Sequence, residues 1–177
     1  MKINTYRVLY RGLEYLFKMA ALLLSAVITG IIIITFFTEN TSIIYTQSGY
    51  TVWLNQTGVI DPAHIAQAAM ITAVFSVALF IHILWKAAHL FKVLRDGQSP
   101  FSTIFVSQLR YIAYTLFAAN FAISAVYSLA LSTLADRAYH LELSFGSSFL
   151  IGLVLIITTK VFAYGMALQA PLEEAVD

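Results

Sequence analysis

The chain contains no cysteine, only three prolines and few charged side chains. Without cysteine there can be no disulfide bond, thiolate zinc site, Cys-ligated iron–sulfur cluster or cysteine nucleophile. Charged residues make up 11% of the sequence, against about 25% in soluble domains, so most of the surface cannot be the usual hydrated one. The formal net charge is only +1, which argues against direct binding of nucleic acid.

What the sequence has in excess is apolar side chains, which account for 60% of its 177 residues, with a mean hydropathy of +0.82. A soluble fold of this length has too little interior to bury so many of them, so lipid must surround most of the protein. Four apolar stretches are each long enough to cross a ~30 Å hydrocarbon core. We therefore predict one domain, 1–177, that is an all-α bundle of four transmembrane helices at about 16–37, 64–85, 111–134 and 148–169.

The basic residues predict the orientation of these helices. One outer loop has no lysine or arginine and the other has only Arg137, whereas eight basic residues lie before the first helix, at its start, or between the second and third helices: Lys2, Arg7, Arg11, Lys18, Lys86, Lys92, Arg95 and Arg110. Both termini are therefore expected in the cytoplasm. The first stretch is longer than the apolar region of a signal peptide and lacks a convincing cleavage site, so it is interpreted as a retained helix.

The first outer loop is predicted to form a small β-hairpin cap. Two β-prone runs, 42–47 and 50–55, flank Ser48-Gly49, and a two-residue turn with glycine is a hairpin signal. The second outer loop is expected to add an extended segment at 139–145. Asp61-Pro62 has the residue types of a helix start, with an N-cap carboxylate followed by proline.

The connection 86–110 is the candidate docking surface on the cytoplasmic side. Helical spacing continues past the second apolar stretch, Asp96-Gly97 is expected to end that helix, and Ser99-Pro100 to start the next. Two uses are open: the segment lies on anionic lipid, or it presents Phe91, Lys92 and Arg95 to a cytoplasmic protein.

Polar residues within the apolar stretches are the candidate intramembrane site. Asn120, Ser124 and Ser128 recur at four-residue spacing in the third stretch. Packing between helices is the preferred interpretation, and a polar track for a substrate is the alternative. Ser148 and Gly152 form a small-xxx-small pair, which also favours close packing.

Lys160 is the one charge well inside a predicted span, and three interpretations remain open. It reaches back to the cytoplasmic interface, pairs with Glu14 or Asn120 inside the bundle, or takes part in transport or proton relay. Glu14 itself is expected to form an interfacial ion pair among Arg11 and Lys18. The four histidines do not suggest a haem or metal site, and no cofactor is predicted.

Two segments carry a family resemblance: 94–102, Leu-Arg-Asp-Gly-Gln-Ser-Pro-Phe-Ser, and 162–169, Phe-Ala-Tyr-Gly-Met-Ala-Leu-Gln. Together with four spans they resemble a family of uncharacterised bacterial four-helix membrane proteins, classed as a domain of unknown function. The chain departs from that pattern at Ala170-Pro171-Leu172. The resemblance implies a bacterial inner-membrane location and, because members often occur beside small helix-turn-helix regulators, a regulatory role. It carries over no catalytic residue.

These features predict a non-enzymatic inner-membrane protein that senses or binds a partner and acts on a cytoplasmic regulator. Membrane lipids and a cytoplasmic regulatory protein are the expected partners, and the oligomeric state is left open. The alternative is a small transporter or an accessory subunit of a membrane complex, suggested by Lys160 and the polar stripe. A membrane enzyme ranks third, because no acid–base pair or nucleophile converges at one depth.

Overall fold

The computed structural model describes residues 2–37, 50–54, 61–134, 139–143 and 145–174, and the side chains of 6–33, 61–134 and 145–168. Its elements are α1 (Lys2–Phe37), β1 (Tyr50–Leu54), α2 (Pro62–Arg95), α3 (Thr103–Leu134), β2 (Tyr139–Leu143) and α4 (Ser147–Glu174). All four helices are long and apolar enough to cross a membrane, which confirms the predicted number of such helices.

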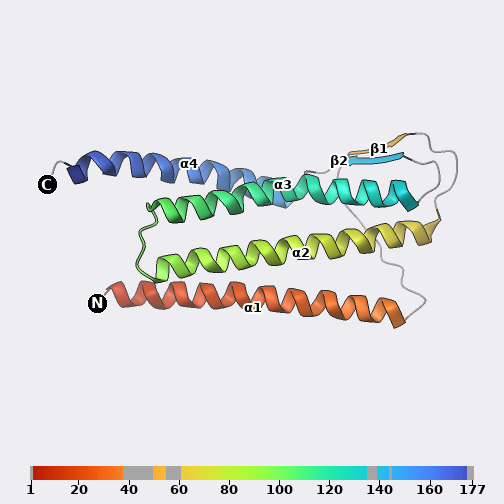
Figure 1. The fold of residues 1–177 in the computed structure, drawn as a ribbon, viewed down its shortest axis with the longest axis horizontal. Coiled ribbons are helices and arrows are strands. Elements are labelled where there is room, and N and C mark those ends of the chain that lie inside the picture. Colours follow the sequence, from red (N-terminus) through yellow and green to blue (C-terminus); the bar gives the residue numbers. More distant parts are fainter. Residues whose placement is uncertain (1, 38–49, 55–60, 135–138, 144, 175–177) are drawn as a thin grey trace.

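The helices lie side by side in chain order as an open row (Figure 1). Within the described residues, α1 contacts no helix except α2, and α4 contacts no helix except α3. The predicted four-helix bundle is therefore an open one. Sequence could not show this, because a face that meets lipid is as apolar as a face that meets another helix.

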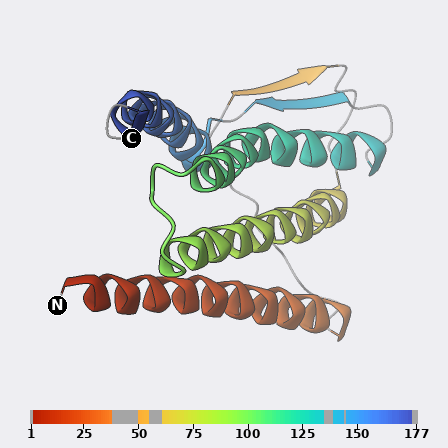
Figure 2. The same ribbon diagram turned by 60° about the vertical axis from the view of Figure 1, so that its left-hand side comes forward.

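The start of α1, the turn between α2 and α3 and the last residues of α4 lie at one end of the row, which we call the terminal end (Figure 1). The strands lie toward the opposite, loop end, beside the outer part of α3 (Figure 2). All four helices extend beyond the predicted apolar stretches at the terminal end. There α1 begins at Lys2, α2 ends at Arg95, α3 begins at Thr103 and α4 ends at Glu174.

The helix ends lie where the local residue types predict them, except that α3 begins one turn later. Asp61 is the N-cap of α2, and its carboxylate accepts the N–H of Ala63 at 2.9 Å, as predicted. Gly97 ends α2 with φ 93°, a left-handed conformation that glycine adopts readily. The predicted start of α3 at Ser99-Pro100 is one turn early. Ser99 and Pro100 belong to a turn, and Ser102 is the cap, because its hydroxyl accepts the N–H of Phe105 at 3.3 Å.

The two strands pair antiparallel, with Tyr50 opposite Leu143 and Leu54 opposite Tyr139. Both the 50–54 strand and the extended segment beginning at Tyr139 were predicted, but the described partner of β1 is β2 rather than 42–47. The run 42–47 lies outside the described residues. The cap that the structure describes therefore joins the two loops to each other instead of folding one loop on itself.

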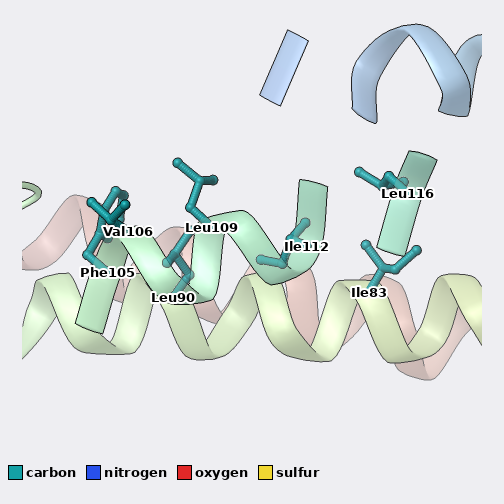
Figure 3. Packing of buried hydrophobic residues seen from close by; sticks show 7 residues of the cluster. All are labelled: Ile83, Leu90, Phe105, Val106, Leu109, Ile112 and Leu116. Atoms are coloured by element: carbon teal, nitrogen blue, oxygen red, sulfur yellow. The ribbon is translucent and has the colours of Figure 1, made fainter. Parts of the chain in front are cut away.

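The main hydrophobic core lies between α2 and α3 (Figure 3). Leu90 and Ile83 of α2 meet a row of apolar side chains on α3, namely Phe105, Val106, Leu109, Ile112 and Leu116. By contrast, α1 and α4 keep many large apolar side chains exposed, including Leu22, Val27, Val154 and Ile157. Such surfaces are suited to contact with acyl chains. The two helices with the best-packed interface, α2 and α3, lie in the middle of the row.

Candidate functional site

A cluster of charged side chains joins α1 to α2 at the terminal end. Glu14 is 3% exposed, and its carboxylate accepts hydrogen bonds from Lys18 Nζ at 2.6 Å and from Arg95 Nη1 at 2.5 Å. Arg95 Nε also donates to Asp96 Oδ1 at 3.2 Å. A carboxylate so buried needs opposite charge and hydrogen bonds together, and it has both here. We call Glu14, Lys18 and Arg95 the charge cluster.

The predicted ion pair of Glu14 with Lys18 is confirmed, but the contribution of Arg95 was missed. Glu14 and Arg95 are 81 positions apart in sequence, so no local spacing links them. The signal available beforehand was only that both are charged residues near the same end of adjacent apolar stretches.

Two of the three candidate docking residues take part in this junction. Phe91 stacks on Phe17 of α1 with ring centroids 5.3 Å apart and planes inclined by 22°. Arg95 binds Glu14, and its side chain is 24% exposed. Phe91 and Arg95, two of the predicted docking residues, thus hold α1 against α2. Lys92 is exposed, and its charge also acts on Glu14.

The turn that follows the charge cluster is ordered by backbone hydrogen bonds. Gln98 N–H donates to Val93 O at 3.3 Å and Gly97 N–H to Leu94 O at 3.2 Å, a pattern that satisfies the last carbonyls of α2. A Cβ added at Gly97 would lie 4.0 Å from Arg7 Nη2, so the turn also lies beside α1. Lys92, Asp96 and Gln98 are exposed here. We call these three residues the turn surface.

The polar stripe of α3 is buried. Asn120, Ser124 and Ser128 are 4%, 2% and 5% exposed, which agrees with helix packing and not with a face toward lipid. Asn120 Oδ1 accepts the N–H of Gly146 at 2.9 Å, where the chain enters α4. Asn120 therefore supplies an acceptor for a backbone donor at a helix start, and it ties α3 to α4.

Gly152 is where α3 and α4 approach most closely among the described glycines. A Cβ built there would lie 2.6 Å from the backbone nitrogen of Phe117 and 2.9 Å from its Cα. No side chain fits such a space without a shift of one helix. The predicted small-residue packing of the fourth stretch thus corresponds to a direct helix–helix approach.

Lys160 is exposed on α4, away from the stripe and from the charge cluster. Its depth follows from its neighbours, because Phe162 packs on Phe105, near the start of α3, with ring centroids 5.7 Å apart. Lys160 is two residues, about 3 Å, farther toward the loop end. This places it in the part of the row that contains Lys86 and Arg110 and favours the interfacial interpretation. Pairing with Glu14 is contradicted, since α4 does not contact α1 in the described residues.

None of the side chains that the structure describes forms a group of three or more His, Asp or Glu suited to a metal ion. His82 instead shares a hydrogen bond of 3.0 Å with the hydroxyl of Tyr111. This hydrogen bond joins α2 to α3.

Comparison with known proteins gives one match. Residues 45–176 match the family described as "Protein of unknown function (DUF2975)". The match includes both strands and α2, α3 and α4, but not α1. No curated protein and no solved structure matches the chain. Because the matched segment covers about three quarters of the sequence, the chain belongs to this family of unknown function.

Proposed function

We propose that the chain is a non-enzymatic protein of the bacterial inner membrane that binds a partner and acts on a cytoplasmic regulator through its turn surface. In this proposal the terminal end is cytoplasmic. The support is the distribution of charge: nine of the ten basic residues lie toward the terminal end, and the tenth, Arg137, is outside the described residues.

The observation that carries the proposal is the junction between the turn surface and α1. Arg95 is adjacent in sequence to Asp96 of the turn surface, and the same guanidinium binds Glu14 of α1. A displacement of α1 along α2 must therefore change the position of Arg95. The exposed residues beside it would move in response, which gives a route from the membrane to the cytoplasmic face.

A non-catalytic role is supported by the contacts of the acidic side chains that the structure describes, because each of them is engaged in an ion pair or a helix cap. Glu14 binds two cations, Asp96 binds Arg95, and Asp61 caps α2. Each carboxylate thus has a structural task.

An accessory subunit of a membrane complex is the second candidate. It is favoured by the open row, in which the outer sides of α1 and α4 carry exposed apolar residues such as Leu23 and Val161. Transport along the polar stripe is less favoured, because Asn120 is engaged at the start of α4 and Lys160 lies elsewhere.

Photocrosslinking in living cells tests the proposal. A photoreactive residue in place of Gln98 is expected to capture a cytoplasmic protein, and Lys92→Glu, which reverses an exposed charge beside it, is expected to abolish the capture. The same photoreactive residue in place of Ala63, at the loop end, is the matched control and should not capture that protein. If the Gln98 position yields lipid adducts alone, the proposed action on a cytoplasmic regulator is wrong.

A further inference from the structure

A groove of about 540 Å³ runs along α3, outside the charge cluster. Leu79 of α2 forms part of one wall, and α3 lines the groove from Ser107 to Ala122. These α3 positions extend over about 22 Å of helix. One leaflet of a ~30 Å hydrocarbon core is about 15 Å deep, so the groove is long enough to hold a chain through a whole leaflet.

The groove changes in character along its length. Its loop-end part is lined by the small side chains of Ala118, Ala119 and Ala122. Its terminal-end part contains Arg110 and continues, through the shared Ser107 and Tyr111, into a second hollow of about 230 Å³ lined also by Lys86 and Gln108. An apolar channel thus leads past Arg110 to a hollow that contains Lys86 and several hydrogen-bonding groups.

The two cations of the groove differ from those of the charge cluster. Lys18 and Arg95 bind Glu14, whereas neither Lys86 nor Arg110 has a carboxylate within 4 Å among the described side chains. Lys86 Nζ instead lies 5.2 Å from the ring centre of Tyr111.

The Tyr111 hydroxyl is in turn held at 3.0 Å from His82 Nε2. Tyr111 is thereby positioned beside Lys86, and neither Lys86 nor Arg110 has a carboxylate partner among the described side chains. Charges at the edge of the hydrocarbon are costly without such a partner.

We propose that this groove binds one anionic phospholipid, with its phosphate at Lys86 and Arg110 and an acyl chain along the alanines. Charge complementarity selects an anionic headgroup, since basic pockets between transmembrane helices on the cytoplasmic side are suited to such groups. The apolar extension distinguishes a phospholipid from a soluble anion, which would use only the pocket. This site is separate from the charge cluster, so it does not depend on the proposed action on a regulator.

The test uses the full chain in phosphatidylcholine nanodiscs that contain a titrated amount of photoreactive phosphatidylglycerol, with the diazirine in the acyl chain. Adducts are expected on the α3 peptide that contains Ala118 and Ala122. Lys86→Gln combined with Arg110→Gln should raise the half-saturating lipid fraction about 30-fold, from about 1 kcal/mol for each basic residue. Arg11→Gln, which removes an exposed charge on α1, a helix that does not contact α3 in the described residues, should leave it unchanged.

Two results would overturn the lipid site. The first is equal labelling of this peptide by a photoreactive phosphatidylcholine, which would mean that the groove holds bulk lipid only. The second is an unchanged saturation curve for the double variant, measured on protein whose thermal transition in detergent matches that of the unsubstituted chain. Because Lys86 is half-buried and Arg110 exposed, both substitutions are expected to be tolerated by the fold.

Discussion

Substitution of Gly152 by alanine is expected to separate α3 from α4. The new Cβ would lie 2.6 Å from the backbone nitrogen of Phe117. Backbone atoms cannot relieve such a contact by a change of rotamer, as a flexible side chain can. One helix must therefore move by roughly 0.8 Å to restore ordinary contact. Overpacking of this kind costs about 1–3 kcal/mol, equivalent to about a 5- to 150-fold fall in the folded-to-unfolded ratio.

The assay is reversible unfolding in mixed micelles with increasing sodium dodecyl sulfate, followed by circular dichroism. Gly30→Ala is the matched control, because no atom lies within 4 Å of the added Cβ on α1. Both substitutions gain the same helix propensity of about 1 kcal/mol, so the difference between them isolates the steric effect. If Gly152→Ala unfolds at the same detergent fraction as Gly30→Ala, the close approach of α3 and α4 is wrong.

Two further predictions use the same unfolding assay. Glu14→Gln should lower the free energy of unfolding by about 1.5–3 kcal/mol, since it removes the buried charge that accepts hydrogen bonds from both Lys18 and Arg95. Asp96→Asn, at a carboxylate that is 53% exposed, should cost at most ~1 kcal/mol. Equal losses would contradict the burial of the charge cluster. Asn120→Leu should lower the free energy of unfolding by about 1–3 kcal/mol because the Gly146 N–H loses its acceptor. An unchanged unfolding transition would show that this hydrogen bond does not stabilise the fold.

The number of helices and several of their ends could be predicted from the sequence because each depends on local chemistry. A run of about 20 apolar residues predicts a span, and Asp61-Pro62 and Asp96-Gly97 have the residue types of helix ends. The pairing of the two loops could not be predicted. The partner of Tyr50–Leu54 is a segment from another loop, and strand propensity does not specify which distant strand is the partner.

The candidate site was predictable only in part, for a similar reason. Four-residue spacing correctly placed Asn120, Ser124 and Ser128 on one face of a helix, and their burial follows from the cost of polar groups in lipid. The link between Glu14 and Arg95 depends on how α1 lies against α2, and Phe91 faces α1 for the same reason. Helices that are apolar all round give no sign of which face will be covered.

The central claim is that the turn surface lies in the cytoplasm, and single-cysteine labelling tests it most directly. The chain has no cysteine of its own, so Gln98→Cys and Ala63→Cys each introduce one unique thiol at an exposed position at opposite ends of the row. In cells whose outer membrane alone is permeabilised, a membrane-impermeant maleimide is expected to label Ala63→Cys. It is expected to label Gln98→Cys only after the inner membrane is permeabilised as well. Labelling of Gln98→Cys in intact cells, with Ala63→Cys protected, would contradict the orientation and the function proposed from it.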